Sequence, residues 1–271
     1  MSEEDLRDKI RKEILKSGFP LELYCQQKVL DYNWSINMNK QYQDKDDNFR
    51  EIDIEAHKQD MIAENLRLST RLIIECKKNH SNPWVFFREK THGPIMYLTV
   101  AGDIDESGKE NFFWRHHYKE TVLEHHYKTT TDKSRAYVVP FKHDNPKENR
   151  QIYESVSSVI NYYKHHGLEK IRTFDRNFIK LFYFVVVYDG KLFMADVING
   201  EDVHVEDTSH VLLGVSNVDG KRTRHYTVDI VTKEFFGEYL KILENDGLLT
   251  AEYALSIHDK KLDESLLSHS L

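Results

Sequence analysis

The sequence predicts a mixed α/β protein in which helices cover a mixed β-sheet. Apolar and polar residues alternate over several stretches between residues 34 and 87, which is typical of strands. Residues 151–165 repeat apolar side chains at helical spacing, and the eight-residue apolar run from Leu181 to Tyr188 is typical of a buried strand. This mixture of helices, strands and hairpins favours a helix-covered sheet over a sandwich or a bundle.

Length and composition limit the class of protein. The 271 residues are 39% hydrophobic, enough for a full core, which excludes collagen-like, disulfide-stapled and wholly disordered chains. With 45 acidic and 38 basic residues the net charge is −7, which argues against a surface covered in positive charge but leaves room for a local basic groove. A membrane span needs about 20 apolar residues, so we expect no membrane segment. We expect a reduced cytoplasmic location, because the two cysteines form no CxxC motif and the acidic N-terminus has no secretory signal.

Two helices are predicted at the N-terminus. Residues 3–16 form an exposed helix, which Gly18 ends. Pro20 fits the first turn of a second helix that runs to about Asp31. Its residues Leu21, Cys25 and Val29 recur every fourth position, which indicates a face packed on the core, and both cysteines are expected to be small core side chains.

The middle of the chain contains four predicted strands followed by a polar insertion. The strands are 34–42, 49–57, 70–76 and 84–87. Residues 88–150 are rich in His, Lys and Glu with mixed periodicity, so we expect some helix and long loops there.

The second half of the chain resumes with clear periodicity. After the helix at 151–165, a strand at 179–188 should turn at Asp189-Gly190 into a return strand at 191–197. The remaining predicted elements are strands at 204–213 and 225–231, a helix at 233–244, and a further helix after residue 247. We interpret residues 1–271 as a single domain, whose parts are a core at about 18–87 and 151–200, the insertion at 88–150, and C-terminal strands and helix at 201–271.

Three charged residues on adjacent strands give the strongest chemical signal. Glu75 and Lys77 project from one face of their strand, because strand side chains alternate. Charges on an otherwise apolar strand need partners, and Asp53 on the neighbouring strand is a natural one. Strands lie about 4.8 Å apart, so Asp53 and Glu75 could share one divalent cation. Their hard oxygen ligands suit Mg²⁺ or Mn²⁺.

This pattern resembles the PD-(D/E)XK nuclease superfamily, which has the restriction-endonuclease-like fold. Asp53 matches the acid on one strand, and Glu75-Cys76-Lys77 matches Glu-x-Lys on the next. Glu22, in the helix before the first strand, matches a glutamate that reaches the metal site in some members, including those like Holliday-junction resolvases. The chain departs from the pattern at Ile52, where the family often has proline. The resemblance covers about residues 18–87, with the helix at 151–165 and strand at 179–188 as later fold elements.

The resemblance implies Mg²⁺-dependent hydrolysis of phosphodiester bonds in DNA, with an endonuclease expected. Asp53 and Glu75 would hold Mg²⁺, the backbone carbonyl of Cys76 would be a further ligand, and Glu22 would complete the site. Lys77 would orient the attacking water and stabilise charge in the transition state. Several family members act as dimers, but no dimer signature is readable here, so a homodimer stays open.

Several alternatives stay open beside this interpretation. The cluster could be an ordinary surface salt bridge, the fold could be an inactive module that binds nucleic acid or protein, or the substrate could be RNA. Glu22 is equally well explained as a solvated carboxylate in a first helical turn. Glu55 could supply another oxygen, although a structural role fits it better.

The histidine pairs and the aromatic, basic stretch of the insertion are not expected to form a metal or catalytic site. Adjacent histidines point in different directions on a helix or a strand, and no zinc-ligand spacing supports a metal site, so His125 and His126 are expected to be structural or substrate-facing. The stretch from Trp114 to Lys128 could contact phosphates and bases, but a solvated helical hairpin fits it better.

Overall fold

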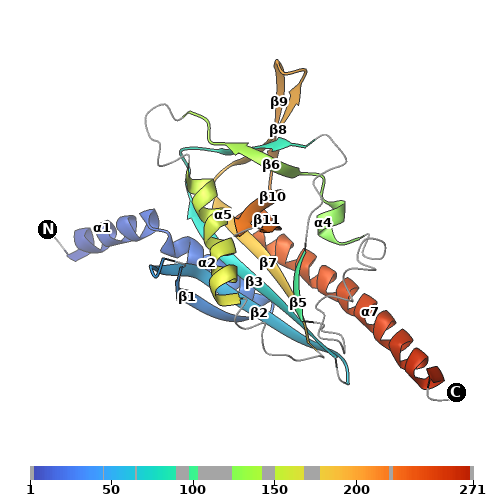
Figure 1. Cartoon of the computed structure of the whole chain (residues 1–271). Coiled ribbons are helices and arrows are strands. Elements are labelled where there is room, and N and C mark those ends of the chain that lie inside the picture. The colour runs from blue at the N-terminus through green and yellow to red at the C-terminus, as the bar shows by residue number, and fades with distance from the viewer. Residues whose placement is uncertain are drawn as a thin grey trace.

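The structure is a computed structural model that describes residues 3–44, 46–64, 66–89, 98–102, 124–141, 150–167, 178–219 and 222–268. Its described strands form one 11-stranded mixed sheet with helices on both faces (Figure 1). The helices are α1 (Glu3–Lys16), α2 (Phe19–Asp31), α4 (His126–Thr129), α5 (Gln151–Tyr162), the π-helical turn η2 (Tyr163–Gly167) and α7 (Phe236–Ser268). The strands are β1 (Ser35–Gln43), β2 (Phe49–Ala63), β3 (Leu66–Lys78), β4 (Trp84–Arg88), β5 (Thr99–Gly102), β6 (Lys133–Val138), β7 (Phe178–Asp189), β8 (Leu192–Ile198), β9 (Asp202–Thr208), β10 (His210–Asp219) and β11 (Arg222–Thr232).

The strand order combines local antiparallel pairs with long-range parallel ones. Along the sheet the order is β1-β2-β3-β7-β11-β10-β6-β4-β8-β9, and β5 pairs with β7 off this path. The strands β1, β2 and β3 form an antiparallel meander, and β3 and β7 are parallel along their whole length. The apolar run predicted at 181–188 is therefore the centre of the sheet, where burial on both faces explains its unbroken apolar character.

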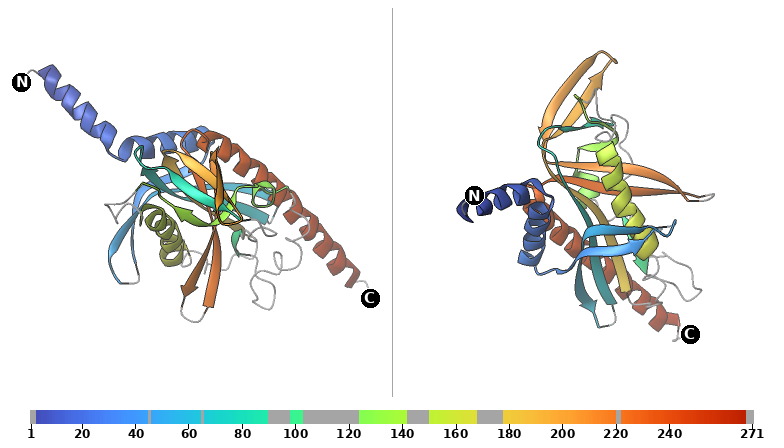
Figure 2. Two further views of the ribbon diagram at one scale, coloured as in Figure 1. Left: turned by 90° about the horizontal axis from the view of Figure 1, so that it is seen from above. Right: turned by 90° about the vertical axis from the view of Figure 1, so that its left-hand side faces the viewer.

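Two apolar clusters lie on the two faces of the sheet. Helices α2 and α7 cover one face, and α5 covers the other (Figure 2). The predicted stripe of α2 is buried as expected, because Leu21, Cys25 and Val29 are each at most 2% exposed. By contrast, α1 buries no residue and projects away from the sheet. No described helix combines the length and apolarity needed to cross a membrane.

The predicted hairpin between residues 179–188 and 191–197 is wrong. Within the described residues, β7 pairs with β3 on one side and with β11 and β5 on the other, so no edge is left for the next strand. Strand β8 pairs instead with β4 and β9. Gly190 fits this sharp exit, because a Cβ atom there would lie 2.5 Å from the carbonyl oxygen of Asn79.

Two further element boundaries differ from the predictions. The segment 204–213 is divided between two strands. Strand β9 pairs with β8, whereas β10 pairs with β11. The C-terminal helix does not end near residue 244. The whole helix α7 is 33 residues long and passes through Gly247 to Ser268, with its early turns anchored in the core.

The segment 88–150 is more than a polar insertion. Its strand β6 lies inside the main sheet between β10 and β4, and β5 pairs with β7. Tyr127 is 2% exposed in the core, so the described end of the predicted solvated hairpin is buried. Residues 103–123, including His116 and His117, lie outside the described residues.

Candidate functional site: carboxylates where two strands separate

Asp53 lies where β2 and β3 stop pairing. The antiparallel register of these strands ends at Ile54 opposite Ile74. One step further, the backbone N–H of Cys76 donates to Asp53 Oδ2 at 2.6 Å, in place of a hydrogen bond to the other strand. The carboxylate therefore satisfies a donor that the separation of the strands would leave unpaired, and this contact fixes its position.

Glu75 and Lys77 project toward the side of the sheet covered by α5. The side chain of Glu75 is mostly buried, and its Oε2 accepts a hydrogen bond from Ser158 Oγ of α5 at 2.8 Å. Its Oε1 lies 2.7 Å from Lys77 Nζ. The alternation predicted from the sequence thus places both side chains together, and α5 adds a hydroxyl that orients the carboxylate.

The carboxylates at this position repel each other. Burial and the neighbouring charge of Glu75 raise the pKa of Asp53 to about 7, against the opposing effects of the Cys76 N–H and Lys77. For Lys77, burial acts to lower the pKa, but Glu75 and Asp53 raise it above its usual value, so the side chain stays protonated. The site therefore holds excess negative charge that Lys77 alone does not neutralise.

Glu22 of α2 lies close enough to this cluster for its charges to shift the pKa of Glu22. Partial burial, together with the charges of Asp53 and Glu51, raises the pKa of Glu22, while Lys77 lowers it. Its side chain packs close to the helix start, because a Cβ at Gly18 would lie 3.2 Å from Glu22 Oε1. The structure thus brings Glu22 into the neighbourhood of the predicted site, although no direct contact joins it to Asp53 or Glu75 among the described hydrogen bonds.

Asp53, Glu75 and Glu22 offer carboxylate oxygens, the type of ligand that Mg²⁺ and Mn²⁺ prefer. In the part of the chain that the structure describes, however, these three carboxylates do not come within 4.8 Å of one another as a group. Cys76 enters the site through its backbone N–H, while its side chain is buried with the core. The role of its carbonyl oxygen stays a prediction.

Glu55 has the structural surroundings that the sequence favoured. It is 4% exposed and forms ion pairs with Lys40 at 2.5 Å and with Arg71 at 3.0 Å. Because Lys40 and Arg71 both pair with its carboxylate, Glu55 has a structural role in the sheet and does not belong to the Asp53 cluster.

The sequence did not identify Ser158 or Tyr42 as neighbours of Glu75. Burial and the charge of Glu75 raise the pKa of Tyr42 to about 12, which places the phenol near this carboxylate. Ser158 is a small polar residue next to the buried Val159 on an amphipathic helix, and this position is the only signal that could have marked it. Which side chain it meets depends on how α5 crosses the sheet.

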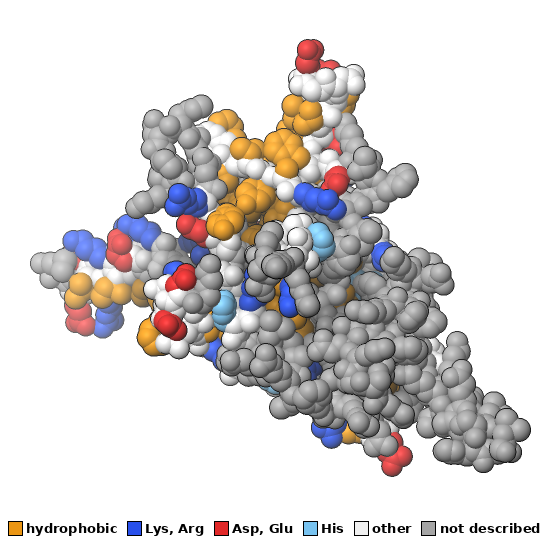
Figure 3. Space-filling model, in the orientation of Figure 1, with side chains coloured by type: hydrophobic (Ala, Val, Ile, Leu, Met, Phe, Trp, Pro, Cys, Tyr) orange, Lys and Arg blue, Asp and Glu red, His pale blue; other side chains and the backbone are white. Residues whose placement is uncertain are grey.

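A separate apolar pocket of about 600 Å³ lies between β4, β6, β8 and β9. Its lining includes the exposed Phe141 and Val203, and apolar side chains gather on this face below the β8–β9 hairpin (Figure 3). Among the described residues, this lining contains no carboxylate. The Asp53 cluster is the better candidate for catalysis.

Comparisons with protein-family models, with curated proteins and with solved structures find no match for this chain. Its function is therefore argued from the geometry and charge of the site.

Proposed function

We propose that this protein is a metal-dependent nuclease that hydrolyses phosphodiester bonds in DNA, acting as an endonuclease. The observation that carries the proposal is the meeting of Asp53, Glu75 and Lys77 where β2 and β3 separate. An ordinary salt bridge would pair its charges, whereas here burial and Glu75 raise the pKa of Asp53 to about 7. A site with excess negative charge is suited to a cation.

The order of elements supports a restriction-endonuclease-like core. A helix, α2, precedes the antiparallel meander β1–β2–β3, and α5 then leads to β7, which is parallel to β3. These are the elements in which the resemblance places its first acid, its Glu-x-Lys motif and its later helix and strand. The proposed fold family and the proposed chemistry thus rest on the same segment of the sheet.

Each residue has a role that follows from its surroundings. Asp53 and Glu75 would hold Mg²⁺, which when bound neutralises phosphate charge and makes water a better nucleophile at neutral pH. Ser158 fixes the orientation of Glu75 through its hydrogen bond. Glu75 and Asp53 raise the pKa of Lys77, so this cation would stabilise negative charge on the phosphate and orient the water. Glu22 would contribute a further carboxylate near the cation.

The test is cleavage of supercoiled plasmid in Mg²⁺, with Mg²⁺ binding measured by calorimetry on the same samples. We expect Asp53→Asn and Glu75→Gln to lose both binding and cleavage. Lys77→Met should keep Mg²⁺ binding and lose about 100-fold or more in rate, the size of effect seen when one charge-stabilising group is removed. Glu55→Gln is the matched control, because it removes a buried carboxylate charge from the neighbouring strand outside the cluster.

Unchanged cleavage in Asp53→Asn would contradict the proposal. Mg²⁺ binding with cleavage of RNA only would keep the chemistry and correct the substrate. Absence of Mg²⁺ binding in the folded wild type would instead make the cluster a structural ion pair, and the chain a binding module.

A further inference from the structure

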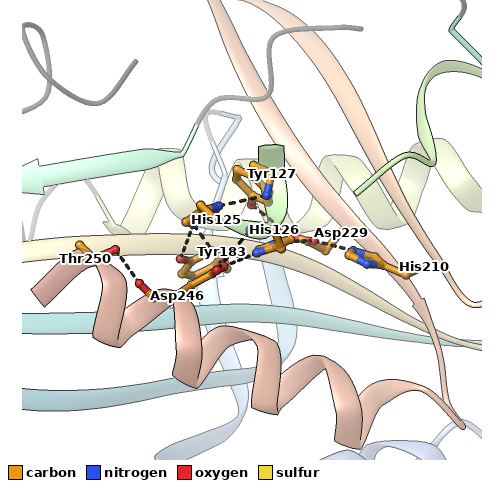
Figure 4. A network of polar contacts seen from close by, with 8 residues as sticks. All are labelled: His125, His126, Tyr127, Tyr183, His210, Asp229, Asp246 and Thr250. Atoms are coloured by element: carbon orange, nitrogen blue, oxygen red, sulfur yellow. Dashed lines mark hydrogen bonds and ion pairs between the residues drawn. The ribbon is translucent and has the colours of Figure 1, made fainter. Parts of the chain in front are cut away.

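A second cluster of ionisable side chains is buried between the sheet and α7. It contains three histidines, two aspartates and two tyrosines from segments far apart in the sequence (Figure 4). His126 begins α4, His210 begins β10, Asp229 lies in β11 and Asp246 lies in α7. None of these residues belongs to the Asp53 cluster, so the inference below is independent of the proposed nuclease function.

Two imidazoles point at one carboxylate oxygen. His126 Nε2 lies 3.0 Å from Asp229 Oδ1, and His210 Nε2 lies 2.9 Å from the same oxygen. The strand register explains part of this convergence, because Leu212 is opposite Asp229 and His210 lies two residues away on the same face. The side chains of the three residues are at most 8% exposed, so two nitrogen donors and one oxygen donor converge in a nearly dry environment.

In two of these ligands, His126 and Asp229, the atoms that face away from the site already have partners. The Nδ1 atom of His126 contacts the carboxylate of Asp246, whose other oxygen accepts a hydrogen bond from the His126 backbone N–H at 3.2 Å. The Oδ2 atom of Asp229 accepts a hydrogen bond from the Tyr127 hydroxyl at 3.0 Å. A carboxylate on the far nitrogen of a metal-ligating histidine fixes its tautomer and orientation, and Asp246 occupies that position for His126.

His125 is excluded from the ligand set by its own hydrogen bonds. Its Nδ1 accepts from the Tyr127 backbone N–H at 3.0 Å, so the proton of the neutral ring lies on Nε2. That nitrogen lies 3.0 Å from the Tyr183 hydroxyl and 3.2 Å from Asp246. The rings of His125 and His126 nevertheless stack, with centroids 4.8 Å apart, contrary to the expectation that adjacent histidines diverge. The reason is that the chain changes from extended at His125 to helical at His126.

We propose that His126 Nε2, His210 Nε2 and Asp229 Oδ1 form a binding site for Zn²⁺, with a water molecule in the fourth position. Two imidazoles and one carboxylate suit zinc and related transition metals better than Mg²⁺, which prefers oxygen ligands alone. The charge also balances, because a divalent ion with neutral histidines offsets Asp229 and Asp246. A pocket of about 510 Å³ borders the cluster, because its lining includes His126 and Asp246.

The bound ion would hold four elements together. Asp229 and His210 belong to adjacent strands, His126 brings in α4, and Asp246 ties the arrangement to α7. A network that is only structural would not take up a metal ion, whereas a metal site binds one ion and depends on all three ligands.

The test is Zn²⁺ titration of the full chain, measured by calorimetry after treatment with EDTA. We expect one Zn²⁺ per chain. Co²⁺ in the same site should give the intense visible absorption of tetrahedral coordination. His210→Asn and Asp229→Asn should lose Zn²⁺ binding, and Asp246→Asn should weaken it by about 10–100-fold through the orientation of His126.

His204→Ala is the matched control, since His204 is an exposed histidine of β9 and its removal should leave Zn²⁺ binding unchanged. Circular dichroism identifies the variants that fold, and if His210→Asn does not fold, His210→Gln takes its place. The proposal is overturned if the folded wild type binds no stoichiometric Zn²⁺, or if folded ligand variants bind it as tightly as the wild type does. It is also overturned if Asp53→Asn, rather than the ligand variants, abolishes binding.

Discussion

Asp53 is a half-buried and Asp229 a fully buried aspartate of one sheet, and their surroundings act on the pKa in opposite directions. Burial and the charge of Glu75 raise the pKa of Asp53 to about 7. Burial acts to raise the pKa of Asp229 as well, but His126 and His210 hold it well below its usual range. The first carboxylate lacks enough positive charge nearby, while the second is matched by groups of the chain itself. A buried carboxylate alone is therefore weak evidence for a site, and its neighbours decide what it can do.

The largest expected effect on stability comes from removing Asp229, whose charge is matched by two histidines. Asp229→Ala in EDTA should lower the free energy of unfolding by about 3–5 kcal/mol, because it leaves His126 and His210 buried without their shared acceptor. Urea denaturation followed by circular dichroism measures the change. Asp60→Ala, at an exposed position of β2, is the control and should leave the urea midpoint unchanged. Equal midpoints for the two variants would contradict the importance of the network.

A second prediction separates two glutamates on neighbouring strands. Glu55→Gln should cost about 1–3 kcal/mol of stability and leave cleavage intact, because Lys40 and Arg71 lose a charged acceptor. Glu75→Gln should cost less than about 1 kcal/mol, since its amide still accepts from Ser158 and the lost partner Lys77 is partly exposed. Urea denaturation and the plasmid assay measure the two properties, and the reverse order of stability loss would refute this division.

The sequence predicted the Asp53 cluster but not the histidine network around Asp229. Asp53, Glu75 and Lys77 lie within 25 positions on strands that pair locally, so alternation alone predicted their meeting. His210 and Asp229 meet through the antiparallel pair β10–β11, but His126 and Asp246 join them from α4 and α7, more than 80 and 15 positions away, through contacts that no strand alternation encodes. The same cause explains the wrong hairpin after β7, because a turn sequence does not reveal that both edges of a strand are already occupied.

The raised pKa of Asp53 predicts a pH dependence in metal-free protein. Between about pH 4 and 7 the folded chain holds a proton on Asp53 that the unfolded chain releases, so this group makes stability fall as pH rises through that window. Asp53→Asn should remove this slope while keeping an acceptor for the Cys76 N–H. Urea midpoints of both proteins at intervals of pH in EDTA measure the difference. Parallel pH profiles would show that Asp53 ionises normally.

The smallest expected effect on stability concerns α1, which buries no residue. Arg7→Ala removes an ion pair with Glu3 in which both side chains are largely exposed, so the melting temperature should not change measurably. Differential scanning calorimetry provides the comparison with wild type. A clear loss of stability would mean that α1 packs against something beyond the chain.

The long separation between strand partners has a consequence for synthesis on the ribosome. The meander β1–β2–β3 can pair as soon as residue 78 has emerged, but its parallel neighbour β7 is completed only at residue 189. Asp246 belongs to α7 and is translated later still. We therefore expect the Asp53 cluster to assemble before the histidine network, so a chain halted shortly after β7 would carry the first arrangement while the apolar face meant for α7 stays open to chaperones.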